Sequence, residues 1–157
     1  MTRILIVVAA LWAAGQEKKA DERFERLKKL VGEWTGEDGK VASKYAITAG
    51  GSAIAETIFP GTDHEMLTVY TMDGKNLVLT HYCVLGNQPH MKAAEKFDGK
   101  TLSFSCVSVG NAGSHDDAHM HSALFTFTDD DHYTAAWGSS EKGKDGEVHT
   151  FKFSRKK

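Results

Sequence analysis

The chain has 157 residues, of which 25% are charged, and its formal net charge is −2 when histidine is neutral. This length predicts one domain, and the near balance of charge argues against a nucleic-acid binder that works by bulk electrostatics. Fifteen glycines and two prolines are typical of a turn-rich β protein rather than of a disordered chain. We interpret the basic residues 155–157 as a frayed terminus rather than as a nucleic-acid patch.

The first fifteen residues have the composition of a secretory signal peptide. Arg3 supplies the positive start, residues 4–14 are an unbroken apolar run, and the small residues 13–15 offer a cleavage site. The apolar run is too short for an ordinary transmembrane helix. We therefore predict a signal peptide over 1–15, export to the periplasm or the extracellular space, and one mature domain over 16–157 without a membrane span. The alternative is an apolar N-terminal helix that is not cleaved.

Residues 17–31 predict one amphipathic helix that ends at Gly32. Glu22 and Arg26 form a favourable pair four residues apart on its polar face. We expect the apolar face to cover the mouth or the flank of a larger structure. That face carries Ala20, Phe24, Leu27, Leu30 and Val31.

From residue 32 onward the pattern predicts about ten short strands separated by turn residues. The clearest hairpin joins its two strands through Asp73-Gly74-Lys75, because Asp-Gly is among the strongest hairpin signals. Sequential hairpins predict an up-and-down meander, which removes its edges by closing into a barrel. The predicted fold class is an all-β, closed antiparallel up-and-down barrel with one N-terminal helix. The strands are expected at 33–37, 41–48, 52–59, 66–72, 77–84, 90–97, 102–108, 119–127, 132–138 and 148–153.

Alternation along the strands predicts which side chains point inward. The inward faces are apolar toward one end of the barrel and carry His or Cys toward the other. When each strand is followed in its direction, all but one of the eight histidines fall at this second end, the exception being His132. The expected inward sets are Leu77, Leu79, His81 and Cys83; Leu102, Phe104 and Cys106; His119, His121, Ala123, Phe125 and Phe127; and His149, Phe151 and Phe153.

The histidine-rich rim suggests a metal site, since His and Cys are the usual ligands of zinc and copper. His119 and His121 lie on one face of a strand, and we group His149 with them as candidate metal ligands. The following residues of the preceding loop offer further donors: His115, Asp116 and Asp117. The alternative is that these histidines are solvated rim residues or hydrogen-bonded wall residues.

The same rim predicts a pocket for a small apolar or mixed-polarity ligand. The alternative is that the aromatic and methionine side chains are plain core. His81 and Cys83 stand about 7 Å apart on one strand, too far for direct proton transfer, and no catalytic motif is visible. We expect a binding protein rather than an enzyme, with a metal-binding protein or metal-dependent enzyme as the alternative. The candidate ligand-binding residues are His81, Tyr82, Cys83, Met91, Cys106 and Trp137.

The two cysteines are predicted to be free thiols. Cys83 and Cys106 fall near the same ends of two strands that have one strand between them. Strands two positions apart are separated by about 9–10 Å, whereas a disulfide needs Cα atoms within about 7 Å. We therefore expect two inward-facing free thiols, although the predicted export would bring the protein into an oxidising compartment where disulfides can form.

The stretch Gly32-Glu33-Trp34-Thr35-Gly36-Glu37-Asp38-Gly39 resembles the Gly-x-Trp opening of lipocalins and other calycins. It is closer still to the Gly-x-Trp-x-Gly-x-Gly opening of nitrobindin-like barrels, with Asp38 displacing the last glycine by one position. The whole mature chain resembles exported bacterial proteins with a lipocalin-like domain of unknown function. The resemblance implies a barrel whose bottom is closed by Trp34. Nitrobindin-like proteins bind haem through a histidine near the C-terminus, for which His149 is the nearest candidate, so haem binding is a second alternative.

Overall fold

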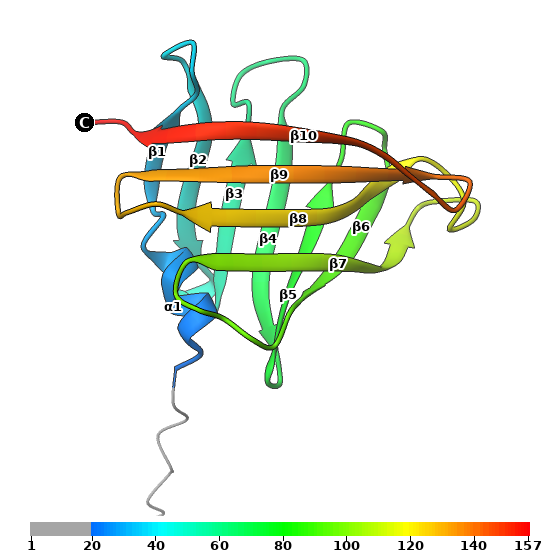
Figure 1. Ribbon diagram of the computed structural model, residues 1–157, viewed down its shortest axis with the longest axis horizontal. Helices are drawn as coiled ribbons and strands as arrows, with labels where there is room; N and C mark the ends of the chain where they lie inside the picture. Colours follow the sequence, from blue (N-terminus) through cyan, green and yellow to red (C-terminus); the bar gives the residue numbers. More distant parts are fainter. Residues whose placement is uncertain (1–19) are drawn as a thin grey trace, which may run out of the picture.

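The computed structural model describes residues 20–157, and the predicted signal peptide lies outside them. Ten strands form a closed antiparallel barrel in which each strand pairs with its sequence neighbours and β1 pairs with β10 (Figure 1). The predicted all-β, up-and-down barrel with one helix is confirmed. The elements are α1 (Glu22–Lys28), β1 (Gly32–Thr35), β2 (Val41–Thr48), the short 3₁₀ helix η1 (Ala49–Gly51), β3 (Ala53–Ile58), β4 (Met66–Asp73), β5 (Asn76–Tyr82), β6 (Gln88–Ala93), β7 (Thr101–Gly110), β8 (His119–Phe127), β9 (His132–Glu141) and β10 (Lys144–Arg155).

The helix α1 is shorter than the sequence predicts. It begins at Glu22 because Asp21 caps it, its Oδ1 accepting hydrogen bonds from the backbone N–H of Arg23 at 3.0 Å and of Phe24 at 3.3 Å. The helix ends at Lys28, and Gly32 already belongs to β1, so the prediction that Gly32 ends the helix is wrong. Residues 17–19 of the predicted helix lie outside the described residues. No helix in the described range is long and apolar enough to cross a membrane.

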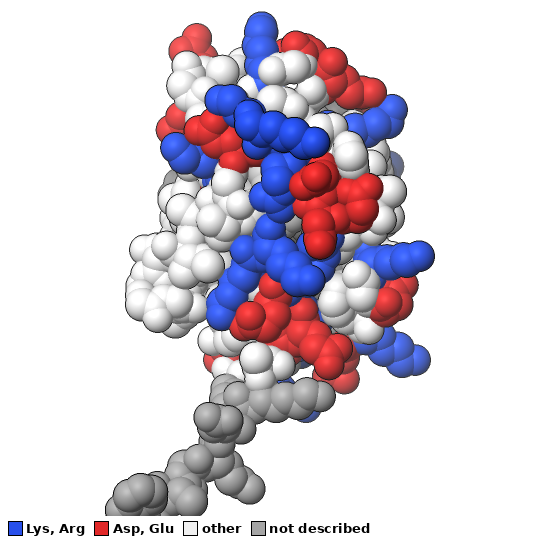
Figure 2. Space-filling model, turned by 90° about the vertical axis from the view of Figure 1, so that its left-hand side faces the viewer, with Lys and Arg blue, Asp and Glu red and all other residues white. Residues whose placement is uncertain are grey.

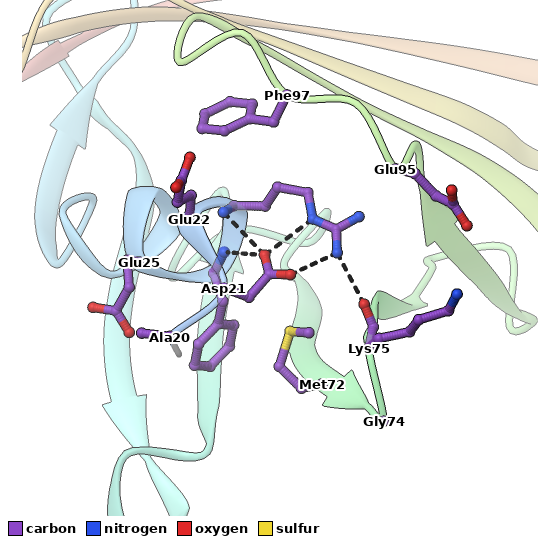
Figure 3. Close-up of a pocket in the computed structure, with 11 residues that line it drawn as sticks. Ala20, Asp21, Glu22, Glu25, Met72, Gly74, Lys75, Glu95 and Phe97 are labelled. Atoms are coloured by element: carbon purple, nitrogen blue, oxygen red, sulfur yellow. Dashed lines mark hydrogen bonds and ion pairs between the residues drawn. The ribbon is translucent and has the colours of Figure 1, made fainter. Parts of the chain in front are cut away.

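Arg23 fastens α1 to the barrel. Its guanidinium is buried and donates hydrogen bonds to the Oδ2 of Asp21 at 2.6 Å, the carbonyl of Ala94 at 2.8 Å and the carbonyl of Lys75 at 3.0 Å. Figure 3 shows Asp21 and Lys75 approaching this guanidinium from the helix and from the β4–β5 turn. The helix is therefore tied to two loops at one end of the barrel, which we call the lower end.

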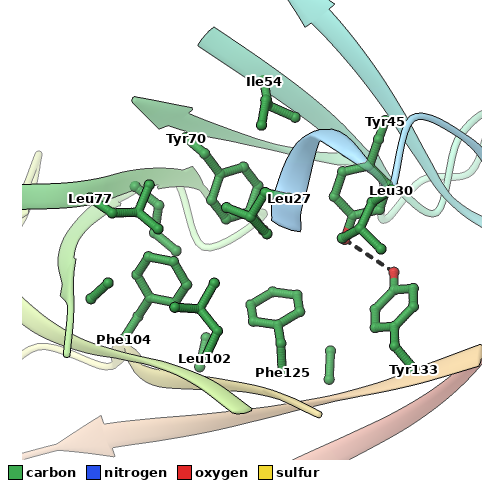
Figure 4. Packing of buried hydrophobic residues seen from close by; sticks show 14 of the residues in the cluster. Leu27, Leu30, Tyr45, Ile54, Tyr70, Leu77, Leu102, Phe104, Phe125 and Tyr133 are labelled. Atoms are coloured by element: carbon green, nitrogen blue, oxygen red, sulfur yellow. Dashed lines mark hydrogen bonds between the residues drawn. The ribbon is translucent and has the colours of Figure 1, made fainter. Parts of the chain in front are cut away.

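Side chains fill the lower half of the barrel (Figure 4). Tyr70 packs against Phe104 and Phe125 with ring centroids 6.0 and 6.3 Å apart, and α1 adds Leu27 from below. These side chains are almost wholly buried, which confirms that the inward faces are apolar at this end. Other members of the same cluster are Leu30, Tyr45, Ile54, Leu77, Leu102 and Tyr133.

Trp34 closes the bottom of the barrel, as the lipocalin resemblance implies. It is 1% exposed, and its Nε1 donates to the carbonyl of Leu30 at 2.7 Å. The guanidinium of Arg155 lies over the ring, 4.3 Å from its centroid, and the backbone N–H of Lys156 donates to the carbonyl of Glu33 at 2.9 Å. The prediction of a frayed terminus is therefore wrong for Arg155 and Lys156, because their carbonyl and ring partners come from a distant part of the chain.

Charges of both signs are interleaved over the side of the molecule that carries the end of β10 and the β8–β9 turn (Figure 2). Among the ion pairs there, Lys156 meets Glu33 at 2.7 Å and Arg155 meets Asp131 at 3.1 Å. This face presents no field of a single sign of the kind that attracts nucleic acid.

Candidate functional site

The upper half of the barrel, opposite α1, contains a pocket of about 330 Å³. Its walls come from strands on both sides of the barrel and from the loops that follow β3 and β5. Most of the lining is apolar, and four of the lining residues are aromatic. The lining residues are Glu56, Ile58, Phe59, His64, Met66, His81, Cys83, Val84, Leu85, Met120, Trp137, His149, Phe151 and Phe153.

Glu56 lies at the inner end of this pocket and is 2% exposed. Its Oε1 accepts hydrogen bonds from Ser43 at 2.7 Å and Tyr45 at 2.6 Å, and its Oε2 accepts one from Tyr70 at 2.5 Å. Burial raises the pKa of Glu56, and the three hydrogen bonds offset only part of that effect. Burial also raises the pKa of the two tyrosines well above the ordinary value, so both remain phenol donors.

The three hydroxyl groups leave acceptor capacity on Glu56. A carboxylate offers about four lone-pair sites, and three are occupied by Ser43, Tyr45 and Tyr70. Within residues 20–157 no Lys or Arg side chain forms an ion pair or hydrogen bond with this carboxyl group. One acceptor site therefore remains available to a molecule in the pocket.

His81 is the second buried polar residue of the pocket, at 2% exposure. Its Nδ1 lies 2.9 Å from the hydroxyl of Thr68, and its ring is 4.9 Å from that of Trp137. Burial lowers the pKa of His81 to about 4, so the imidazole is neutral at neutral pH. Its Nε2 has no hydrogen-bond partner among the described residues, which leaves one polar atom of the ring for a ligand.

The mouth of the pocket carries two exposed histidines, His64 and His149. His149 contacts Glu147 at 3.8 Å and retains 57% of its side-chain exposure. Cys83 follows β5 and is half-buried in the wall. Thus three predicted ligand-binding residues, His81, Cys83 and Trp137, meet in one pocket.

The structure places the other three predicted ligand-binding residues elsewhere. Tyr82 points away from the barrel interior and is 47% exposed, whereas Met91 is fully buried in the core. Cys106 belongs to a separate histidine cluster, described below. Glu56 is not among the predicted site residues. The signal that could have identified it is a charged residue on an otherwise apolar strand face, which Glu56 shares with Ile54 and Ile58.

A second group of polar side chains lies where β7 and β8 approach the upper rim. One ligand atom from each of Cys106, His115, His119 and His121 lies within 4.8 Å of the others. The predicted metal residues His119 and His121 are thus together, but the structure puts His149 in the pocket instead.

Neither loop aspartate predicted as a further donor belongs to this group of ligand atoms. The carboxylate of Asp117 accepts hydrogen bonds from the backbone N–H of Gly113 at 2.7 Å and of Ser114 at 3.3 Å. The backbone carbonyl of Asp116 accepts one from the backbone N–H of Lys142 at 2.7 Å. These contacts shape the loop that presents His115.

The architecture of the barrel indicates the class of protein. The closed ten-strand antiparallel barrel is consistent with a calycin or lipocalin-like fold, which is compatible with ligand binding. Comparison of the chain with known protein families and with curated proteins finds no match.

Proposed function

We propose that this protein is an exported binding protein that holds one small, mainly apolar molecule in the upper half of the barrel. The observation that carries the proposal is the apolar-walled pocket of about 330 Å³ above a solid core. Ligand pockets of proteins commonly range over about 300–1,000 Å³ and combine apolar walls with a few polar groups. This pocket lies at the small end of that range, so it suits a compact molecule.

The two buried polar groups specify the polar end of the ligand. Glu56 has one acceptor site left, and His81 offers one ring nitrogen as a neutral group. A ligand that reaches the inner end must satisfy them, because an unpaired buried polar group costs about 1–3 kcal/mol. We therefore expect a compact ring-containing molecule with a hydroxyl or amine donor at one end. The aromatic walls, among them Trp137 and Phe151, would pack against the rings of such a ligand.

The neutral fluorescent probe N-phenyl-1-naphthylamine tests the pocket directly. Wild-type protein should enhance the emission of the probe with one saturable site. Cys83→Phe places a larger side chain in the pocket wall and should weaken binding at least tenfold. Tyr82→Phe, which changes the adjacent residue on the opposite face, is the matched control and should bind as wild type does. Equal probe binding by both variants would place the probe outside this pocket and overturn the proposal.

The natural ligand and the export can be examined in one preparation. Protein purified without a tag from its own host should release a small molecule on extraction with organic solvent, which mass spectrometry would identify. Absorbance of the same sample distinguishes a haem from a colourless ligand. An intact mass that begins at Gln16 or Glu17 would support the signal peptide, and a mass that retains Met1 would contradict it.

A further inference from the structure

Strands β7 and β8 separate near the upper rim. Their pairing runs from Thr101 with Thr126 to Ser105 with Ser122. Beyond this point β7 continues only alongside β6, as far as Gly110, and β8 lies only beside β9. The two strands therefore diverge, and their loop closes the upper end of the gap between them (Figure 1).

The His/Cys cluster, Cys106, His115, His119 and His121, occupies the place where the two strands diverge. Cys106 is the first residue of β7 after the last β7–β8 pair, and His121 is the last residue of β8 before it. His119 adds a buried imidazole two residues earlier in β8, and His115 comes from the loop between the strands. The ring centroid of His115 lies 4.9 Å from that of His119 and 5.8 Å from that of His121, in edge-to-face geometry, so the three imidazoles are in mutual contact.

A β-bulge changes the alternation of β8 beside the cluster. The register of β8 with β9 shifts between Met120 and Ser122, so His121 is the extra residue. Relative to the inward residues Ala123 and Phe125, the extra residue places Met120 rather than His119 in the pocket lining, and His119 and His121 meet in the cluster. The nitrogen atoms Nε2 of His119 and Nδ1 of His121 are 3.1 Å apart.

Hydrogen bonding fixes the tautomer of His119. Its Nδ1 lies 2.7 Å from the carbonyl oxygen of Asp117, which can only accept, so the proton of the neutral ring is on Nδ1. The lone pair of Nε2 then points into the cluster. Histidine ligands of metal ions are commonly oriented in this way, by donating the other ring N–H to a carbonyl or carboxylate.

We propose that Cys106, His115, His119 and His121 bind one zinc ion. Tetrahedral zinc with bonds of about 2.0–2.3 Å places its ligand atoms roughly 3.3–3.8 Å apart, and the four side chains reach that spacing from 4.8 Å or less by small rotations. Binding replaces the contact between the two strand imidazoles with two zinc–nitrogen bonds. The thiol of Cys106, which donates to the carbonyl of Ser108 at 3.3 Å, loses its proton to solvent and becomes the sulfur ligand.

The zinc would join two strands that do not hydrogen-bond to each other at this height. Its site is distinct from the organic-ligand pocket, since none of the four residues lines that pocket. His115 is exposed, and His121 and Cys106 are half-buried, so a metal ion has a path of entry from solvent. The proposal does not depend on the proposed function.

Metal analysis of the whole protein tests the site. After removal of metal by a chelator, the wild type should take up one zinc ion per chain and retain it in the presence of excess Mg²⁺. The double variant His119→Ala, His121→Ala should lose stoichiometric binding. His90→Ala is the matched control, because His90 is a half-buried histidine of another strand and should leave uptake unchanged.

Cobalt substitution identifies the sulfur ligand independently. A tetrahedral Co²⁺ complex of the wild type should show a sulfur-to-cobalt charge-transfer band, which Cys106→Ser should abolish and Cys83→Ser should retain. Asp117→Ala, which frees the loop carrying His115, should weaken zinc binding about ten- to a hundredfold. Circular dichroism verifies that each variant is folded. Zinc uptake that is absent in the wild type, or that survives in the double histidine variant, would overturn the proposal; stoichiometric Cu⁺ in place of zinc would overturn the choice of metal.

Discussion

Glu56 and His81 interrupt the apolar inward faces of β3 and β5, and burial disfavours the charged form of both. It raises the pKa of Glu56 and lowers the pKa of His81 to about 4. The hydroxyl groups around them supply hydrogen bonds rather than charge. The inner end of the pocket is therefore suited to a neutral polar group, and this is why the proposed ligand carries a hydroxyl or an uncharged amine on an apolar body.

His81 should make the protein less stable in acid. Its pKa is about 4 in the folded protein and about 6.5 when unfolded, so the unfolded chain takes up the proton first. The resulting stability is fully present above pH 6.5 and is lost as the pH falls toward 4. By pH 5 the loss is about 2 kcal/mol. Denaturant unfolding at pH 7 and pH 5 should show this loss in the wild type but not in His81→Gln.

His90→Gln provides the matched control for this experiment. His90 bonds the hydroxyl of Thr80 at 2.9 Å, just as His81 bonds Thr68, but it lies half-buried on the outer face of β6. The change in the free energy of unfolding in His90→Gln therefore measures the effect of losing a Thr–His hydrogen bond by itself. If His81→Gln and the wild type lose stability in parallel between pH 7 and pH 5, the assignment of acid sensitivity to His81 is wrong.

Removal of the Glu56 carboxyl group should destabilise the fold severely. Glu56→Ala removes the carboxylate that accepts from the hydroxyl groups of Ser43 and Tyr70, while Tyr45 keeps its contact with Tyr133 at 3.0 Å. Each unsatisfied buried group costs about 1–3 kcal/mol, so the free energy of unfolding should fall by at least about 3 kcal/mol once the lost volume is included. Glu56→Gln retains one acceptor oxygen and should lose less. Equal losses in the two variants, measured by urea unfolding, would show that loss of the carboxylate, rather than the lost volume, is decisive.

The sequence predicts the existence and order of the elements better than their ends. Each of the ten predicted strands overlaps an observed one, because alternation and Asp-Gly or Gly-rich turns are local signals. β10 is longer than predicted, since the polar residues Lys144 and Asp145 pair with β9 without an apolar pattern. The length of the helix is overestimated because an apolar pattern continues past its end. Leu30 is buried, but it belongs to the turn after α1 rather than to the helix.

The bulge in β8 is the feature that local patterns cannot predict. Strict alternation from the inward residues Ala123 and Phe125 places His119 inside and Met120 outside, whereas Met120 lines the pocket and His119 belongs to the cluster. A Cβ atom at Gly138 would lie 2.5 Å from the Oγ of Ser122, so the missing side chain lets β8 and β9 approach beside the bulge. Because this depends on the pairing between two strands, the sequence predicts the pair His119 and His121 but not that Cys106 joins them.

The strand order sets the state of the cysteines. Both are free in the described part of the chain, in agreement with the prediction, because β6 separates β5 from β7. Alkylation of the wild type under denaturing, non-reducing conditions should add two alkyl groups per chain, which intact-mass measurement detects. Zinc-loaded and chelator-treated samples should gain the same number of alkyl groups once they are denatured. A mass without added groups would require a disulfide, which this strand order does not allow.

The whole barrel is asymmetric between its two ends. Apolar side chains and α1 fill the lower half, while the upper half keeps a pocket and gathers the histidines. The direction of each hairpin is enough to predict this division from the sequence. Which of the rim side chains meet depends on barrel curvature and on the path of the β7–β8 loop. For that reason His149 lies in the pocket wall rather than beside His119.

The barrel closes through its shortest seam, and Arg155 reinforces it. β1 and β10 pair through only two residue pairs, Trp34 with Arg155 and Thr35 with Ser154. The guanidinium of Arg155 donates to the carbonyls of Val31 at 3.0 Å and Lys29 at 2.7 Å, in addition to its stacking over Trp34. This side chain thus ties β10 to the turn that leads from α1 into β1.

Arg155→Ala should therefore open the seam before the rest of the barrel. Charged hydrogen bonds and cation–π stacking together suggest a loss of about 3 kcal/mol in the free energy of unfolding. Arg155→Lys should recover less than half of it, because an ammonium group cannot donate in several directions while it stacks. Lys152→Ala removes an exposed ion pair with Glu37 and should have little effect. In hydrogen exchange, Arg155→Ala should deprotect the amides of β1 first, since β10 remains paired with β9; uniform deprotection of all ten strands would show that the seam does not open on its own.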